Sequence, residues 1–409
     1  GAALMEPLSE ADGNAVGMYV DDHVRILSLR NGRPWEQQPA VAAEDSGSQG
    51  ISTSAPQMPQ TTSGPSPTEN DTWRSSKDSY NALMDLEHSR RRVLLANLPT
   101  PLEPAPRLTA EFGGPKIWVK RDDLTGFGLS GNKVRKLEFH LAAAQEAGAD
   151  AVITCGAVQS NHARATALAA ARVGLETILY LRSPDGTAPN TAAGNHLLQL
   201  VAGAKCHFIT PEQWDDRATL LADAAVAHGS AWVIPEGASD ALGALGFVAA
   251  IEEVAPQIDA LGIDQPILWH AASSAGTTAG MVRGAAKLGL EAEIVGSSVG
   301  DPTDVVEHRI RLLLDEADTQ YGRVESAVPW KITDRYIGLG YGRSTTAELA
   351  AQSRATQLTG MLFDPAYTGK ALYGLREEIR FGRIGSDRNV IFWHTGGGFA
   401  VFAHPELLQ

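Results

Sequence analysis

The chain has 409 residues, 43% of them hydrophobic, which is enough for two domains or for one large domain with an insertion. Its formal net charge of −14 at pH 7, without any basic run, argues against nucleic acid as the main partner. No uninterrupted apolar stretch approaches the roughly 20 residues that cross a bilayer, and the start lacks the features of a signal peptide. Two cysteines offer no disulfide framework, so a cytoplasmic protein is expected.

Two segments precede the main part of the chain. Residues 1–34 contain one candidate strand pair, GMYVDDHVRILSLRNG, and we expect an N-terminal extension or the tail of a preceding domain. Residues 35–80 are rich in Pro, Ser, Thr, Gly and Gln and are predicted to be a linker, because they cannot bury enough surface to become ordered. The Gly-Ala start in place of Met fits a piece of a longer protein.

From about residue 80, apolar strands alternate with amphipathic helices. KIWVKRDD and DAVITCG are predicted strands, while KVRKLEFHLAAAQEAG and SNHARATALAAARVG are predicted helices. The first helix has Val134, Leu137, Leu141 and Ala144 on one side. This alternation predicts an α/β fold with parallel sheets covered by helices on both faces. Ligands then bind near the carboxyl ends of strands, where the glycine-rich segments of the chain lie.

One of these segments, SSAGTTAG, has the composition of an anion site. Its glycines allow close backbone approach, its hydroxyls can donate, and the following helix offers free N–H groups to a phosphate. It lacks the lysine of a P-loop. A tight turn that only caps a helix is the competing explanation, and the segment alone does not exclude it.

Lys133 and Lys136 lie one turn apart at the start of a predicted helix. The helix dipole and the neighbouring charge would both lower the pKa of Lys133, leaving an amine that can attack a carbonyl. Two solvated surface lysines are the common alternative. An activated lysine together with a phosphate site is what pyridoxal 5'-phosphate requires.

Six motifs in a fixed order resemble those of the D-cysteine desulfhydrase and 1-aminocyclopropane-1-carboxylate deaminase family. They are PTPLEPAPRLT, WVKRDDLTGFGLSGNKVRKLEF, GAVQSNHAR, GLGYG, FDPAYTGKAL and HTGGG, between about residues 90 and 405. The resemblance implies pyridoxal phosphate as cofactor and the two-domain, open twisted parallel-sheet architecture of fold type II. It also implies a large cofactor-binding domain over residues 81–133 and 251–409, a small domain over 134–250, and a homodimer.

The resemblance assigns roles to individual residues. Lys133 would form the internal aldimine and then remove the Cα proton of the substrate, and Asn161 would contact the phenolic oxygen of the cofactor. The implied cofactor-binding residues are Lys133, Asn132, Asn161, Ala275, Gly276, Thr277, Thr278, Thr368 and Thr395. The implied catalytic residues are Lys133, Ser160, Tyr341 and Tyr367, and the implied substrate-binding residues are Ser160, Asn161 and His162.

Three departures from the deaminase pattern point to carbon–sulfur cleavage. Deaminases of this family typically have Gln, Glu and Leu where this chain has His162, Thr368 and Thr395. A hydroxyl near the pyridine nitrogen makes a weaker electron sink than a carboxylate does, which suits loss of a thiolate. The expected reaction is β-elimination from cysteine or an S-substituted cysteine, releasing thiol or sulfide with pyruvate and ammonia.

Several alternatives stay open at this stage. The chain could be a stand-alone D-cysteine desulfhydrase, a 1-aminocyclopropane-1-carboxylate deaminase, or a lyase domain of a modular polyketide synthase acting on a carrier-bound cysteine conjugate. Cys155 is expected to be a buried strand residue, and Asp122 and Asp123 to brace a turn. The histidines show no metal-ligand spacing, so no metal site is predicted.

Overall fold

In the computed structural model, residues 16–18, 27–29 and 92–408 are described. The two short stretches form strands β1 (Val16–Met18) and β2 (Leu27–Leu29), which pair antiparallel as the sequence predicts for this region. The predicted linker, residues 35–80, lies outside the described residues. The division of the chain into large and small domains stays a prediction.

Two parallel sheets form the framework. The larger sheet has the order β11-β10-β9-β12-β4-β3, and only β3 runs antiparallel to its neighbour. Its strands are β3 (Leu102–Pro104), β4 (Lys116–Lys120), β9 (Ile267–Ala272), β10 (Glu293–Ser298), β11 (Trp330–Thr333) and β12 (Asn389–Trp393). The smaller sheet has the order β7-β6-β5-β8, all parallel. Its strands are β5 (Ala151–Ala157), β6 (Glu176–Arg182), β7 (Lys205–Ile209) and β8 (Ala231–Val233).

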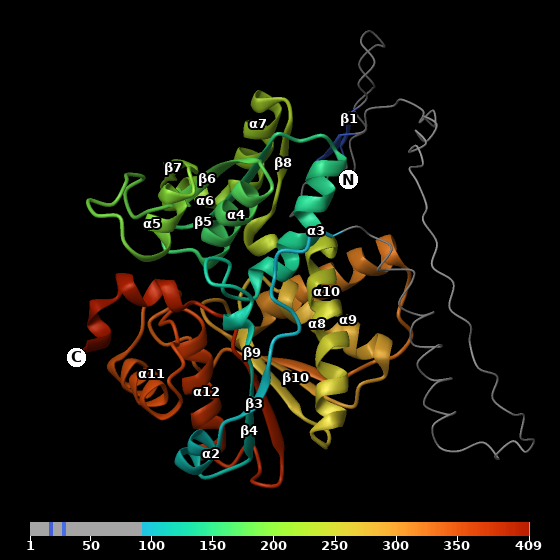
Figure 1. Cartoon of the computed structure of the whole chain (residues 1–409), viewed down its shortest axis with the longest axis vertical. Helices are drawn as coiled ribbons and strands as arrows, with labels where there is room; N and C mark the ends of the chain where they lie inside the picture. The colour runs from blue at the N-terminus through green and yellow to red at the C-terminus, as the bar shows by residue number, and fades with distance from the viewer. Residues whose placement is uncertain (1–15, 19–26, 30–91, 409) are drawn as a thin grey trace, which may run out of the picture. The chain divides into compact units, whose positions relative to one another are not determined.

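Helices cover both faces of each sheet, which confirms the predicted α/β class. They are α2 (Pro106–Phe112), α3 (Lys133–Glu146), α4 (Asn161–Arg172), α5 (Gly194–Val201), α6 (Pro211–Asp215), α7 (Arg217–His228), α8 (Ala241–Ala260), α9 (Gly276–Leu288), α10 (Thr303–Tyr321), α11 (Thr346–Thr359) and α12 (Thr368–Arg380). Short 3-10 turns are η1 (Asp122–Leu124), η2 (Glu236–Ala238), η3 (Gly398–Ala403) and η4 (Pro405–Leu408). Helices α8, α9 and α10 lie on one side of the larger sheet, and α2, α11 and α12 on the other (Figure 1).

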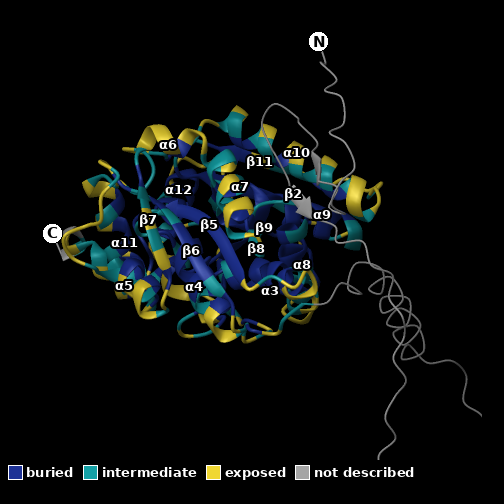
Figure 2. Cartoon of the chain, turned by 90° about the horizontal axis from the view of Figure 1, so that it is seen from above, coloured by how far each residue is buried: buried dark blue, intermediate teal, exposed yellow. Residues whose placement is uncertain are grey.

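Alternate side chains of each strand point to opposite faces of the larger sheet and enter two different hydrophobic cores. Val390 and Phe392 of β12 join the cluster beneath α2, α11 and α12, while Ile391 and Trp393 join the cluster beneath α8 and α9. The central strands are therefore buried on both faces and read as continuous apolar runs, as Figure 2 shows. Helix α8 is long and apolar enough to cross a membrane, but 67% of its apolar window is buried in this core.

The smaller sheet is covered by α3 and α4 on one face. The four apolar residues predicted to lie on one side of α3 are Val134, Leu137, Leu141 and Ala144. All four belong to the hydrophobic cluster on this face, to which alanines of α4 also contribute. Cys155 of β5 is fully buried on the opposite face beneath α6 and α7, so its prediction as a strand residue is confirmed. Helix α3 also packs against α8, and in this way it contacts helices of both sheets.

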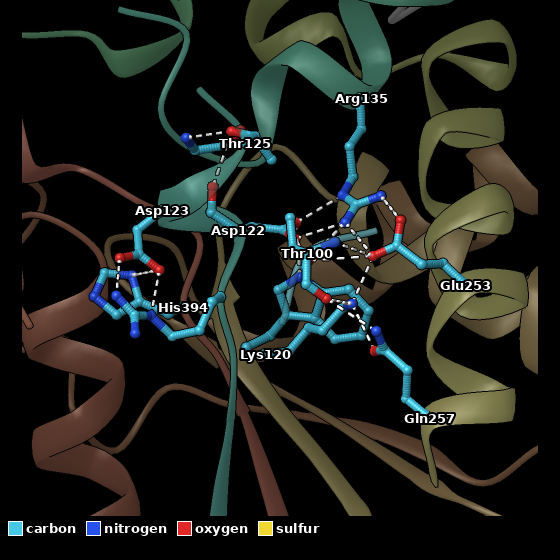
Figure 3. A network of polar contacts seen from close by, with 12 residues as sticks. Thr100, Lys120, Asp122, Asp123, Thr125, Arg135, Glu253, Gln257 and His394 are labelled. Atoms are coloured by element: carbon cyan, nitrogen blue, oxygen red, sulfur yellow. Dashed lines mark hydrogen bonds and ion pairs between the residues drawn. The ribbon is translucent and has the colours of Figure 1, made fainter. Parts of the chain in front are cut away.

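A buried ion network anchors the first turn of α3 (Figure 3). Arg135 donates to both carboxylate oxygens of Asp122 (2.9 and 2.8 Å) and to both of Glu253 (2.9 and 3.0 Å). Lys120 Nζ contacts the same Glu253 carboxylate, and Trp393 Nε1 donates to Asp122 at 2.8 Å. Burial raises the pKa of Glu253, but the hydrogen bonds and charges of Arg135 and Lys120 outweigh burial. The net result is a pKa lowered to about 2. Two cations and two anions thus balance one another at the junction of β4, β12, α3 and α8.

Removing one partner of this network should be costly. Asp122→Ala leaves the Arg135 guanidinium, only 2% exposed, without its closest carboxylate. We expect the free energy of unfolding to fall by about 3–5 kcal/mol, measured by urea titration. Glu111→Ala, which breaks an exposed ion pair with Arg354, is the control and should change stability little. Equal losses in both variants would contradict the importance of burial.

Candidate active site

The start of α3 is held against the ends of β12 and β9. The Asn132 N–H donates to the Thr395 carbonyl (3.1 Å), and Asn132 Nδ2 donates to Thr277 Oγ1 (3.1 Å) at the start of α9. Gly131 has φ +115°, and a Cβ there would lie 2.9 Å from the Thr395 carbonyl oxygen. Glycine is therefore required two residues before Lys133, because the two loops touch through their backbones.

Lys133 is the first residue of α3, and its amine forms no hydrogen bond or ion pair within residues 92–408. Burial lowers its pKa to about 8, while the charge of Glu236 opposes that shift. A substantial fraction of neutral amine is therefore available near neutral pH. From the sequence, the helix dipole and Lys136 were expected to lower the pKa of Lys133, whereas in the structure burial is the leading cause.

Lys136 points to a different place, the start of α9. Its Nζ donates to the Gly237 carbonyl (3.2 Å) and to Ser239 Oγ (3.1 Å). A Cβ at Gly276 would lie 2.8 Å from this Nζ and 2.7 Å from Ser239 Oγ, so only glycine fits. Burial, and then the charge of Lys133, hold the pKa of Lys136 well below its ordinary value. An anion at the start of α9 would relieve both effects.

The predicted anion segment has the geometry of such a site. Ala275 adopts a left-handed conformation (φ 68°) and turns the chain into α9, a helix of 13 residues. The N–H groups of Thr277 and Thr278 lie in its first turn, where no intrahelical acceptor is available to them. With Lys136 alongside, this cup combines backbone donors, a helix dipole and an amine whose charged form a bound anion would favour.

The start of α4 presents three polar residues. Ser160 Oγ accepts from the Ala163 N–H (3.1 Å), which caps the helix and leaves the hydroxyl hydrogen free to donate. Gly156 makes room for it, since a Cβ there would come within 2.6 Å of Ser160. The next two N–H groups, of Asn161 and His162, have no acceptor among the described residues. The helix start is thus a second place for an anion.

The tautomer of His162 follows from its contacts. Thr154 Oγ1 donates to the Ile234 carbonyl (2.7 Å), so it accepts from His162 Nε2 (2.8 Å). The other ring nitrogen, Nδ1, is then an acceptor, and it is buried without a partner in the described chain. Burial, followed by Lys133 and Lys136, keeps the pKa of His162 well below its usual value, so the ring is neutral. A bound ligand could satisfy this acceptor.

The two predicted active-site tyrosines contact each other. The hydroxyl oxygens of Tyr341 and Tyr367 are 2.7 Å apart, and the rings meet edge to face. Burial raises the pKa of Tyr341 to about 12, although the hydrogen bond from Tyr367 opposes this, and burial raises that of Tyr367 further. Both tyrosines therefore stay protonated at neutral pH. One hydroxyl donates to the other, so one hydrogen remains for a third group.

The two threonines predicted to lie near the pyridine nitrogen differ in their hydrogen bonds. The Thr368 hydroxyl donates to Asp364 Oδ1 (2.7 Å) and accepts from the Asp364 N–H (2.8 Å), so its donor is already used. The Thr395 hydroxyl makes no hydrogen bond within residues 92–408. Of these two hydroxyls, that of Thr395 keeps its donor for a ligand.

Sequence reasoning missed three residues of this site. Asp364 accepts from the N–H groups of Tyr367 (3.1 Å) and Thr368 (2.8 Å) and so positions the second tyrosine; its Asp-Pro pair was the available signal. Glu236 follows β8 and influences the pKa values of Lys133 and both tyrosines. Asn195 donates to Asn161 Oδ1 (2.9 Å) from a segment 34 residues away, and no local pattern announces that contact.

Comparison with known proteins identifies the family. Residues 93–396 match the model of the family described as "Pyridoxal-phosphate dependent enzyme". The chain belongs to this family. It is 38% identical over 335 residues to a D-cysteine desulfhydrase of Salmonella paratyphi A, covering 79% of this chain and 100% of the relative. The corresponding protein of Klebsiella pneumoniae is 39% identical over 337 residues, with the same coverage.

Solved structures agree with the fold. The crystal structure of an ACC deaminase homologue superposes with a TM-score of 0.71 at 34% identity, covering 80% of this chain and 98% of the other. A threonine deaminase from Solanum lycopersicum, at 16% identity and a TM-score of 0.55 over 79% of this chain and 85% of the other, shares the fold alone. The protein is thus an enzyme of fold type II that uses pyridoxal phosphate, as the sequence predicted.

The site predicts which lysine takes up the cofactor. Apo-protein mixed with pyridoxal phosphate, reduced with borohydride and mapped by mass spectrometry should carry the label on Lys133 and not on Lys136. Because the pKa of Lys133 is about 8, the labelling rate should rise about tenfold per pH unit below that value and level off above it. Lys133→Arg is the control and should remove the label. Labelling of Lys136, or a rate still rising towards an ordinary lysine pKa of about 10.4, would contradict the assignment.

Proposed function

We propose that the enzyme is a carbon–sulfur β-lyase that acts on cysteine or an S-substituted cysteine. One water is consumed, and thiol or sulfide, pyruvate and ammonia are released. The observation that carries the proposal is the amine of Lys133 at the junction of the two sheets, which forms no hydrogen bond or ion pair within residues 92–408. Burial lowers its pKa to about 8. Similarity to D-cysteine desulfhydrases supports the sulfur-containing substrate.

The residues present fit the cofactor. Its aldehyde would meet Lys133, and its phosphate would lie at Ala275–Thr278 beside Lys136, where a side chain at Gly276 would have no room. Asn161 has its amide oxygen occupied by Asn195, so its NH₂ group would donate to the phenolic oxygen. The free hydroxyl of Thr395 would serve the ring nitrogen, while Asn132 ties the lysine motif to the phosphate cup.

The substrate carboxylate would bind at the start of α4. The N–H groups of Asn161 and His162 and the hydroxyl of Ser160 are donors without acceptors among the described residues, and the helix dipole favours an anion there. The bare Nδ1 of His162 would accept from a donor on the substrate or the cofactor. These contacts would orient Cα towards the lysine.

Lys133 would move the key proton. Bound pyridoxal phosphate supplies an electron sink for charge that develops at Cα. The neutral amine of Lys133 takes the Cα proton as general base, and a pKa of about 8 makes it an effective base near neutral pH. Electron density from the broken C–H bond then forms the Cα–Cβ double bond as the β-thiolate leaves.

The tyrosine pair would stabilise the departing sulfur. An ordinary thiol has a pKa of about 8.5, and burial raises the pKa of Tyr341 to about 12, so full proton transfer from the tyrosine to the thiolate is unfavourable. The pair therefore acts as a hydrogen-bond donor to the thiolate and not as its proton source. Its remaining hydroxyl hydrogen suits this role because both rings stay protonated.

Different candidate functions follow from different substituents on the sulfur of the substrate. Similarity to D-cysteine desulfhydrases supports a stand-alone D-cysteine desulfhydrase as well as it supports a lyase acting on S-substituted cysteines. A carrier-bound conjugate within a larger assembly, a homodimer and a cytoplasmic location stay predictions from sequence. Deaminase chemistry is the remaining alternative, given the ACC deaminase homologue at 34% identity. Product analysis separates the lyase reactions from deaminase chemistry.

A product assay tests the function directly. The loaded enzyme is offered D-cysteine, L-cysteine, S-alkyl L-cysteines and aminocyclopropane carboxylate, with thiol or sulfide and keto acid both measured. We expect sulfur release stoichiometric with pyruvate, and a loss of at least about 100-fold in Lys133→Ala. Sulfide from free D-cysteine alone identifies a stand-alone desulfhydrase. Oxobutyrate from the cyclopropane as the main product would overturn the lyase proposal.

The tyrosine pair gives a leaving-group test. Tyr341→Phe should lower kcat about tenfold for S-alkyl cysteines, whose basic thiolates need the hydrogen bond, and less for S-aryl cysteines. Tyr373→Phe, also in a tyrosine packed edge to face with another, is the control and should leave kcat unchanged. The same loss with both leaving groups would show that Tyr341 does not contact the sulfur.

A further inference from the structure

Arg164 is a buried cation whose hydrogen-bond partners in the described part of the chain are all neutral. It is 1% exposed, and burial lowers its pKa to about 10. Its guanidinium donates to the carbonyls of Gly128 and Ser130 (2.7 Å for Ser130) and to Asn195 Oδ1 (3.1 Å). No carboxylate pairs with it within residues 92–408. Such a charge is expensive to bury, so its position calls for a functional explanation.

The contacts of Asn195 fix the orientation of its amide. A guanidinium can only donate, so Asn195 Oδ1 must face Arg164. A backbone carbonyl can only accept, so Nδ2 must face the Gln159 carbonyl (2.9 Å). The second hydrogen of Nδ2 then goes to Asn161 Oδ1 (2.9 Å). Asn195 is fully buried, which leaves this orientation without a solvated alternative.

We propose that Arg164 and Asn195 are positioning residues that orient the Asn161 amide through this hydrogen-bond chain. With Oδ1 of Asn161 held by Asn195, the NH₂ group is the part that remains free to donate. The inference rests on the proposed function, in which Asn161 donates to the phenolic oxygen of the cofactor. A flipped Asn161 would present its amide oxygen, an acceptor, to the phenolic oxygen of the cofactor and could not stabilise a negative charge there.

Arg164 has a second connection to the same chemistry. By holding the carbonyls of Gly128 and Ser130, it also fixes the loop that leads into Lys133. The ring of Phe399 lies 5.1 Å from its guanidinium carbon, which places a C-terminal segment over the same charge. One buried cation therefore positions both the lysine loop and the amide donor. Asn195 is the better residue to vary, because its contacts lead to Asn161 and not to that loop.

The test is a double-mutant cycle on cofactor affinity. The dissociation constant of pyridoxal phosphate is measured for the wild type, Asn195→Ala, Asn161→Ala and the double variant. We expect Asn195→Ala to weaken binding roughly five- to tenfold, and to have no further effect once Asn161 is alanine. The pH at which the visible absorbance of the bound cofactor titrates should also rise in Asn195→Ala, because a donor to the phenolic oxygen is lost.

Gln199→Ala is the matched control. Gln199 is an equally buried amide on the same helix, and it donates to the neighbouring Val158 carbonyl (3.2 Å) without contacting Asn161. It should leave cofactor affinity unchanged. Asn195→Asp, which retains an acceptor for Arg164 but cannot donate to Asn161, should weaken binding as Asn195→Ala does, and it serves if the alanine variant does not fold.

Three results would overturn the inference. They are unchanged affinity in Asn195→Ala and Asn195→Asp, an equal loss in Gln199→Ala, or an undiminished loss in the Asn161→Ala background. Its failure is distinguishable from failure of the proposed function. A wild type that binds the cofactor and passes this cycle, but releases no sulfur product, overturns the lyase assignment and leaves the positioning chain standing.

Discussion

The buried pairing of Arg135 with Asp122 and Glu253 is the interaction on which the site depends. Arg135 lies two residues after Lys133, so fixing its guanidinium fixes the first turn of α3. Asp122 in turn accepts from Trp393 at the end of β12, and Glu253 belongs to α8. Four elements are thereby held in one arrangement, and the loops that carry the candidate cofactor contacts extend from them. Such a network stabilises only while every charge keeps its partner.

Beyond this balanced network, three cationic side chains lie near the starts of α3 and α4: Lys133, Lys136 and Arg164, of which Lys136 and Arg164 are buried. Burial lowers the pKa of Lys133 and Arg164, and burial with mutual repulsion lowers that of Lys136. Burial and the charges of Lys133 and Lys136 keep the pKa of His162 low, so its ring is neutral. On β9, His270 contacts Thr278 (3.3 Å), and burial and the charge of Lys136 lower its pKa to about 3. Each shift records an unfavourable free energy that a bound anion would reduce. A phosphate and a carboxylate are therefore the ligands that this environment favours.

Donors and acceptors in the site are oriented by residues that need not touch a ligand. Thr154 sets the tautomer of His162, Asn195 sets the amide of Asn161, and Asp364 holds the backbone at Tyr367. In each case a carbonyl, a guanidinium or an N–H group removes the alternative hydrogen-bonding state. Catalysis gains from such preparation because the groups do not have to reorganise when charge develops.

The sequence by itself determined the α/β class, the lysine motif, the glycine-rich segments and the apolar side of α3, because strand and helix periods and turn residues are local properties. It also located the tyrosines and the start of α9. Only the tertiary structure decided that Lys136 faces Gly276 and not Lys133, that the Thr368 hydroxyl is occupied by Asp364, and that Asn195 reaches Asn161. Side-chain direction and the partner of a buried polar group depend on residues far apart in the chain, which packing alone brings together.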